Sequence, residues 1–267
     1  MTDLLVALLE DLAEETAVFD AMLDALGDDE WARPTPAPTW SVGDQVTHLA
    51  YFDDAATMAA TDAETFAEQA VTLVREHAPD FPDWVAAQHR AMGVDAGRTW
   101  FREARARLLS AYGQVDSNAR VPWYGQSMSA ASLLTARLME TWAHGQDVAA
   151  ALGARYPQTA RLRHIAHLGV RTRAFSFAVR GAEAPGTPVR VELLGPDGST
   201  WAWGAKEAAD RVRGQALDFC LVVTQRRHVA DTGLEVRGEA ARSWMEVAQA
   251  FAGAPTVARP TPRRPPP

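Results

Sequence analysis

The most constraining feature of this sequence is the helical spacing of its apolar residues from Thr2 to about Leu152. Across this stretch apolar residues return every three or four positions, which is the spacing that places them on one side of an α-helix. Segments such as "RPTPAPTW" and "APDFPDW" interrupt this helical spacing, because proline cannot continue a helix. The pattern predicts four principal helices joined by connections of varied length, and this favours a four-helix bundle.

Local signals predict where these helices begin and end. Ser41 and Asp44 have the spacing of a capping box, so a helix should begin near Val42. Ser129 is a suitable N-cap for a later helix, and Gly153 is a suitable stop for it. The helical segments expected from these signals and from the apolar spacing are 3–26, from 42 onward, 63–77, 84–112 either unbroken or broken around Gly93 or Gly97, and 130–152.

The pattern changes after Arg155. The stretch 159–181 again has helical spacing, but two alternating apolar runs around Pro-Asp-Gly follow it and indicate a β-hairpin. Two strand–turn–helix patterns come next, in "ADRVRGQALDFCLVVTQRRH" and "GLEVRGEAARSWMEVAQAFAG". We therefore expect the α+β fold class, with a helical bundle in residues 1–156, a smaller α+β domain in residues 157–253, and a disordered tail rich in proline and arginine in residues 254–267.

The charge of the chain limits the classes of partner that it can bind. Its formal net charge is −8, whereas general affinity for nucleic acid or for an anionic membrane requires concentrated positive charge. A small molecule is therefore the expected partner, with no nucleic acid and no membrane. The first residues lack the basic-then-apolar order of a secretory signal, and no run approaches the roughly 18 apolar residues of a membrane span. We expect a cytoplasmic protein.

The chain has one cysteine, Cys220, inside the apolar run "LDFCLVV". A single cysteine cannot form an internal disulfide, and in an apolar run it is more often a small buried side chain than a nucleophile. Any thiol chemistry therefore calls for a thiol from outside the chain.

Glu140 and His144 place polar groups in the helical segment "LMETWAHGQDVAAALG". Because they are four positions apart, their side chains lie on the same flank of the helix and can point at one atom. A carboxylate and a neutral imidazole both coordinate metals such as zinc, and His48, on the flank of another helix, can supply a third ligand. Taken alone, Glu140 and His144 are more often a surface pair, and His48 is more often a polar residue at the edge of the core, than metal ligands.

Two acids are candidates for supporting these ligands from behind. Asp53 falls within the apolar stripe of its helix, where an unpaired carboxylate is costly. It could pair with Arg137, or it could orient a ligand histidine through a hydrogen bond. Asp147 could play the same supporting part, or it could be an acid exposed to solvent.

Three segments carry a further signal: "WSVGDQVTHLAYFD", "METWAHGQDVAAALG" and "RGQALDFCLVVTQRRHVADTGLEVRGEAARSWM". Together they resemble the mycothiol-dependent maleylpyruvate isomerase family, within the DinB-like metal-binding bundles. The resemblance implies that His48, Glu140 and His144 hold a divalent metal, usually zinc. It also implies that arginines of the C-terminal domain contact anionic groups. Arg226 and Arg227 match best and are the catalytic candidates, with structural or solvated arginines as the alternative.

The activity implied by this resemblance needs Zn²⁺, or another divalent metal, together with the low-molecular-weight thiol mycothiol. Three protein ligands leave a tetrahedral metal one open position, where a thiol would be held in its nucleophilic thiolate form. Such a thiolate either isomerises a small electrophilic substrate by reversible addition to a double bond, or forms a conjugate that is kept. A metal-dependent hydrolase that uses water, and a non-catalytic metal- or ligand-binding protein, are the alternatives. Trp40, Trp123 and Trp142 are candidates for the aromatic wall of the site.

Overall fold

The computed structural model describes residues 3–256 except 79, 117–118 and 126. The chain divides into two compact units, Met1–Tyr156 and Pro157–Pro267. The expected disorder of the tail 254–267 falls mostly on residues outside the described part. The α+β fold class expected from the sequence is confirmed, since a helical unit is followed by a smaller unit that contains a four-stranded sheet.

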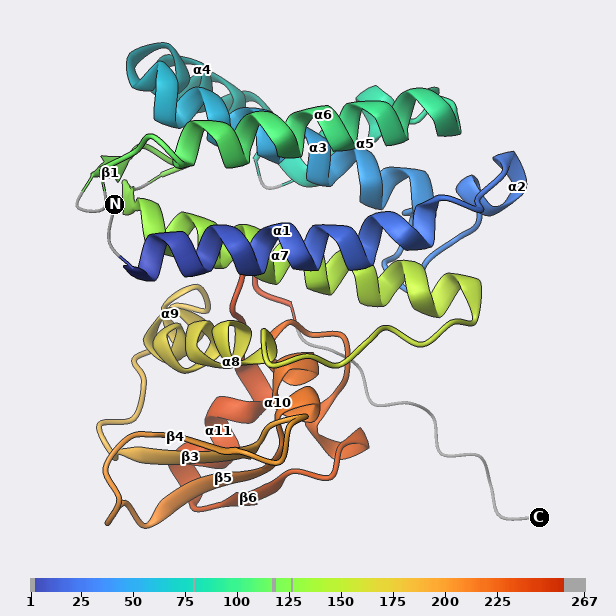
Figure 1. Ribbon diagram of the computed structural model, residues 1–267. Helices are drawn as coiled ribbons and strands as arrows, with labels where there is room; N and C mark the ends of the chain where they lie inside the picture. The colour runs from blue at the N-terminus through green and yellow to red at the C-terminus, as the bar shows by residue number, and fades with distance from the viewer. Residues whose placement is uncertain (1–2, 79, 117–118, 126, 257–267) are drawn as a thin grey trace. The chain divides into compact units, whose positions relative to one another are not determined.

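Four long helices form the bundle of the first unit (Figure 1). Helix α3 packs against both α6 and α7, and α1 packs against the same two helices, which closes the bundle. The short helices α4 and α5 pack against α3, and two-residue strands form a small antiparallel pair ahead of α7. The elements of this unit are α1 (Asp3–Leu23), α2 (Asp28–Trp31), α3 (Val42–Thr61), α4 (Ala63–His77), α5 (Phe81–His89), α6 (Val94–Tyr112), β1 (Arg120–Val121), β2 (Met128–Ser129) and α7 (Ala130–Leu152).

The ends of α3 and α7 follow from capping side chains. The Ser41 hydroxyl accepts a hydrogen bond from the Asp44 backbone N–H at 3.1 Å, and the Asp44 carboxylate accepts one from the Ser41 N–H at 2.8 Å. The predicted capping box is therefore confirmed. Ser129 caps α7, and Gly153 ends that helix with φ 67°, a left-handed conformation that glycine adopts without strain.

Other predicted helix bounds need correction. The segment expected over 84–112 is two helices, and of the alternatives considered the break beside Gly93 is confirmed, because α5 ends at His89 and α6 begins at Val94. Gly97 stays inside α6, where a Cβ atom would lie 2.4 Å from the ring of Trp31, so the missing side chain makes room for that ring. The first helix ends three residues earlier than predicted, and the helix expected over 159–181 is divided between α8 and α9.

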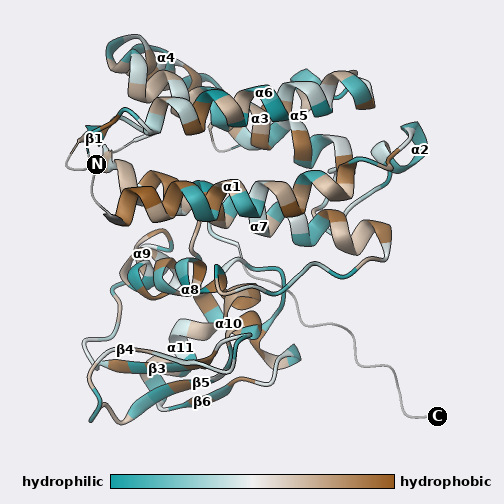
Figure 2. Cartoon of the chain, viewed as in Figure 1, coloured by the Kyte–Doolittle hydropathy of each residue, from teal (hydrophilic) through white to brown (hydrophobic). Residues whose placement is uncertain are grey.

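Apolar side chains from all four long helices fill the middle of the bundle. Each fully buried leucine contributes on the order of 1.5–3 kcal/mol relative to an exposed one. Figure 2 shows hydrophobic and hydrophilic residues interleaved along these helices, as expected when one side of each helix is buried. Examples of fully buried core residues, one from each long helix, are Leu12, Leu49, Leu108 and Leu138.

The second unit packs helices on one face of a sheet with strand order β4-β3-β5-β6. Strand β3 is antiparallel to β4, as the predicted hairpin requires, and parallel to β5, which is antiparallel to β6. Val191, Leu193 and Val212 are fully buried and alternate with more exposed neighbours, so one face of the sheet faces the core. The elements are α8 (Leu162–Arg171), α9 (Arg173–Ala178), β3 (Val189–Leu194), β4 (Thr200–Trp203), β5 (Asp210–Gln215), α10 (Ala216–Val223), a 3₁₀ turn (Val229–Asp231), β6 (Glu235–Arg237) and α11 (Glu239–Val247). Among the described residues, no helix combines the length and the apolar character needed to cross a membrane.

Candidate functional site

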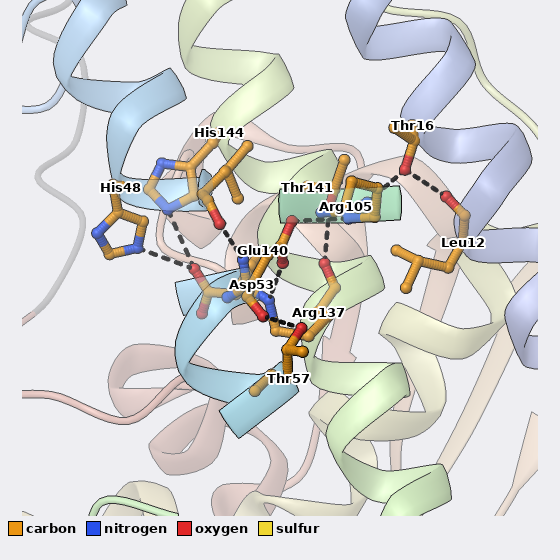
Figure 3. Close-up of polar contacts among 12 residues, drawn as sticks. Leu12, Thr16, His48, Asp53, Thr57, Arg105, Arg137, Glu140, Thr141 and His144 are labelled. Atoms are coloured by element: carbon orange, nitrogen blue, oxygen red, sulfur yellow. Dashed lines mark hydrogen bonds and ion pairs between the residues drawn. The ribbon is translucent and has the colours of Figure 1, made fainter. Parts of the chain in front are cut away.

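Helices α3 and α7 bring His48, Glu140 and His144 together inside the bundle. One potential ligand atom from each residue lies within 4.8 Å of the other two. The Oε2 atom of Glu140 is 3.0 Å from Nε2 of His144 and 3.9 Å from Nε2 of His48. In Figure 3 both imidazole rings lie beside the Glu140 carboxylate. The three residues predicted as ligands from the sequence therefore form one cluster.

Two residues of this cluster have strongly shifted pKa values. Burial, helped by the charge of His144, lowers the pKa of His48 from 6.5 to about 4, so this imidazole is neutral at pH 7. Burial acts to raise the pKa of Glu140, but the hydrogen bond with His144 and the nearby ring of His48 outweigh it and hold that pKa well below its usual 4.5. A neutral imidazole and an ionised carboxylate are the forms that bind a metal.

The cluster fits a divalent metal such as zinc. Two imidazoles and one carboxylate are a donor set that zinc accepts, and three protein ligands leave a tetrahedral ion one further position. The Nδ1 atom of His48 is buried and has no hydrogen-bond partner among the described residues. Nε2 of the same ring faces the Glu140 carboxylate, so Nε2 is the candidate ligand atom, and Nδ1 needs a separate partner from outside the protein.

Gln45 is a site residue that the sequence analysis missed. It is fully buried on α3, and its Oε1 atom contacts Nδ1 of His144, 99 positions away in the sequence. Its Nε2 atom donates to Oγ1 of Thr35 at 2.9 Å. No spacing signal reveals this contact, because α3 and α7 meet only after the bundle has closed.

Aromatic rings cover the two histidines. The ring centroid of Trp40 lies 5.9 Å from that of His144, with the planes 10° apart, and 5.1 Å from that of His48. The ring of Phe52 lies 4.6 Å from His48 on another side. Trp40 is held in place because its Nε1 donates to Asp83 at 2.6 Å. These rings limit the access of water, and each histidine is only 7% exposed.

The buried carboxylate of Asp53 is held between two arginines (Figure 3). Nε of Arg137 donates to one carboxylate oxygen at 2.9 Å, which confirms the predicted pairing, and Nε of Arg105 donates to the other at 2.7 Å. Arg105 was not predicted. It also donates to Thr16 on α1 and, at 2.9 Å, to Thr141 on α7. This network joins all four long helices directly beside the ligand cluster.

The other predicted site residues have mixed outcomes. Asp147 is 5% exposed, so the alternative of an acid facing solvent is wrong, and its supporting role stays a prediction. Arg226 and Arg227 belong to the second unit. Arg227 is paired with Asp218 at 3.2 Å, and Arg226 donates to the backbone oxygen of Thr224 at 2.9 Å. Contact of these two arginines with an anionic substrate stays a prediction.

The predicted wall tryptophans take different places in the first unit. Trp40 lies against the histidines, whereas Trp142 is 2% exposed in the bundle core and Trp123 stacks on Phe66. A cavity of about 430 Å³ is also lined by Trp40, together with residues such as Trp31 and Arg90, but by none of the three candidate ligands. The cavity and the ligand cluster therefore share Trp40 as a wall.

Two segments of the chain match known family models. Residues 12–149, which contain all three candidate ligands, match the model described as the mycothiol maleylpyruvate isomerase N-terminal domain. Residues 185–235 match a second model, described as wyosine base formation.

Two curated proteins are similar to this chain over most of its length. They are Uncharacterized protein MT0041 and Uncharacterized protein Rv0036c, from two strains of Mycobacterium tuberculosis. Each is 46% identical to the chain over 245 residues, which covers 92% of the chain and 95% of the relative.

Among solved structures, the fold is similar to the crystal structure of the mycothiol-dependent maleylpyruvate isomerase. The identity is 19% and the TM-score 0.59, with 88% of this chain and 95% of that chain covered. The crystal structure of a histidine-to-alanine mutant of that isomerase gives 19% identity and a TM-score of 0.58, with 85% and 92% covered. At this level of identity the likeness establishes the fold.

Proposed function

Because the chain belongs to the family of the mycothiol maleylpyruvate isomerase N-terminal domain, we propose that it is an enzyme that combines a divalent metal, zinc, with a low-molecular-weight thiol, mycothiol. The reaction is the isomerisation or S-conjugation of a small electrophilic substrate. The mycothiol-dependent isomerase whose fold the chain shares is named for maleylpyruvate, which makes that compound the first substrate to test.

One observation carries the proposal: His48, Glu140 and His144 place three ligand atoms within 4.8 Å of one another in a mostly buried part of the bundle. This set provides two nitrogen donors and one carboxylate, and it leaves a position for an exogenous ligand. A metal bound there would stabilise the thiolate form of a thiol, which is the nucleophilic form.

The protein's own residues prepare the site for such chemistry. Burial keeps His48 neutral at pH 7, so no proton has to leave it before it can act as a ligand. Trp40 and Phe52 lie against the histidine rings and limit the access of water. Cys220 does not compete as a nucleophile, because it is fully buried and burial raises the pKa of its thiol. The thiol must therefore come from solution.

Arg226 and Arg227 are our candidates for binding an anionic group of the substrate. A guanidinium binds a carboxylate through two parallel hydrogen bonds. Arg227 would have to release or share its contact with Asp218 to do so. Replacing Arg227 with leucine should raise KM for an acidic substrate while metal content stays unchanged. An unchanged KM would remove Arg227 from the site.

The test of the proposal is turnover by the zinc-loaded full chain with maleylpyruvate and with a panel of other small electrophiles, each with and without mycothiol. We expect saturable turnover that requires mycothiol and is lost in Glu140→Ala. Equal turnover in strictly thiol-free buffer would instead support the metal-dependent hydrolase. Absence of turnover with any thiol, together with tight ligand retention, would support a non-catalytic binding protein.

A further inference from the structure

We propose that Gln45 is a positioning residue that selects which ring nitrogen of His144 faces the metal. The inference rests on the proposed metal site, and it assigns a role to a side chain that lies outside the ligand set. The Gln45 amide oxygen holds His144 with a proton on Nδ1. Nε2 then faces the Glu140 carboxylate and His48, where a bound metal would take the place of its hydrogen bond to Glu140.

The backbone oxygen of Trp40 can only accept hydrogen bonds. The Thr35 hydroxyl lies 2.9 Å from this oxygen and donates its single proton to it. Oγ1 of Thr35 must then accept from its other neighbour, the Gln45 side chain, at 2.9 Å. The Gln45 group that faces Thr35 is therefore the amide NH₂, and the amide oxygen faces the opposite way.

The opposite end of the amide contacts Nδ1 of His144. An amide oxygen accepts but cannot donate, so Nδ1 must carry the proton in this contact. The second ring nitrogen, Nε2, lies 3.0 Å from Oε2 of Glu140, inside the ligand cluster. A carbonyl-type acceptor on the far nitrogen is the usual way in which a protein fixes the tautomer and ring orientation of a metal-binding histidine.

The loop that anchors this chain of hydrogen bonds is itself well held. Thr35 also donates its backbone N–H to the Trp40 oxygen at 2.8 Å, and Val42 donates to the Arg33 oxygen at 3.0 Å. An isolated bridge pairs Pro34 with Ser41 across the loop. The loop that places the Trp40 ring over the histidines therefore also fixes the direction of the Gln45 amide.

The first test measures zinc affinity of the full chain by competition with a chromophoric chelator. Gln45→Leu removes the amide oxygen that accepts from His144 and keeps a side chain of similar size. We expect its zinc affinity to fall about 10- to 100-fold. Gln45→Glu keeps an acceptor opposite Nδ1 and should return affinity to within about threefold of the wild type. Thr47→Val is the matched control, because Thr47 is buried on the same helix and its hydroxyl donates to backbone oxygens of that helix. Its affinity should not change.

Gln45 is fully buried, so Gln45→Leu could fail to fold. For that case Thr35→Val offers a milder change, because it removes the hydroxyl that fixes the amide direction at a half-buried position. The zinc affinity of Thr35→Val should lie between that of Gln45→Leu, which is lower, and that of Thr47→Val, which is measurably higher. Affinity equal to the control in Thr35→Val, or in a folded Gln45→Leu, would overturn the proposal.

The second test reads the tautomer directly from ¹⁵N-histidine NMR spectra of the zinc-loaded full chain, with the His144 signal identified by its loss in His144→Gln. The proposal requires a protonated Nδ1 that couples to its hydrogen, and a zinc-shifted Nε2. A protonated Nε2 would mean that the amide points the other way and would refute it. If the wild type binds no zinc at all, the proposed function fails. If it binds zinc equally well with and without Gln45, only the present inference fails.

Discussion

Nε of Arg105 donates to Oδ2 of Asp53 at 2.7 Å, and neither side chain is more than 2% exposed. This pair joins α6 to α3, and Arg137 joins the same carboxylate to α7. The helices that carry the ligand cluster are thus fixed to one another through a single buried acid.

Replacing that acid should destabilise the protein strongly. Asp53→Asn leaves two buried guanidinium groups without their counterion, a change that costs about 3–5 kcal/mol in comparable buried pairs. Urea unfolding measures the loss. Asp54→Asn is the matched control, because the neighbouring acid is 36% exposed where it pairs with Arg107, and it should lose about 1 kcal/mol or less. Similar losses in the two variants would contradict the importance of the buried network.

The stability of the metal-free protein should depend on pH through His48. The pKa of His48 is lowered from 6.5 to about 4 in the folded state. Between these values the unfolded chain binds a proton that the folded chain does not, so stability falls as pH falls through this window. The expected loss from His48 between pH 7 and pH 5 is about 2 kcal/mol.

Urea unfolding of the metal-free wild type and of His48→Gln at the two pH values checks this expectation. The pKa of Glu140 lies below 4.5 when folded, so this residue affects stability only at lower pH and does not disturb the comparison. The variant should lose about 2 kcal/mol less than the wild type on acidification. Equal losses would show that His48 is not held neutral by burial.

Cys220 should be inert in the native protein. It is fully buried, its Sγ lies 3.4 Å from the backbone oxygen of Leu162, and burial raises the pKa of its thiol. A thiol reagent such as DTNB should react with the native protein at least about a hundred times more slowly than with the unfolded protein, because only an exposed thiolate reacts. Cys220→Ala should keep any mycothiol-dependent turnover. Rapid labelling of the native chain would overturn this view.

Trp40 should slow the release of the metal. Its ring covers both histidines, so Trp40→Ala admits water to the cluster and should speed zinc loss to a chelator by about tenfold. Trp40→Phe keeps an aromatic ring over the histidines, so its rate of zinc loss should lie between those of the wild type and Trp40→Ala. Trp84→Ala is the control, because the ring of Trp84 stacks on His77. If the control and Trp40→Ala release zinc at the same rate, the covering role is wrong.

The fold was largely readable from the sequence because its signals are local. Helix starts at Val42 and Ala130 follow from capping residues next to them, and the hairpin follows from a turn beside two alternating runs. The predictions for the end of the first helix and for the start of α5 were less accurate, since several residues there are compatible with helix and with loop. Gly97 lies inside α6, where its missing side chain makes room for the ring of Trp31, a contact that spacing does not reveal.

The site was only partly readable for the same reason. Glu140 and His144 are one helical turn apart, so their spacing is visible in the sequence, and Asp53 was conspicuous as an acid in an apolar stripe. Gln45 and Arg105 act on partners from other helices. Arg105 is a buried arginine in a helix that also carries the exposed Arg102 and Arg107, so the sequence gives no sign of its partner until the helices are packed.

The most direct test of the account is the metal content of the purified full chain, measured by elemental analysis after loading with zinc and removal of excess ion. The cluster of His48, Glu140 and His144 predicts one tightly bound divalent ion per chain, and its loss in each of the three alanine variants. His89→Ala, which changes a histidine that lies against Trp100, should keep the ion. A wild-type chain without stoichiometric metal, or unchanged content in His48→Ala and His144→Ala, would contradict the central claim.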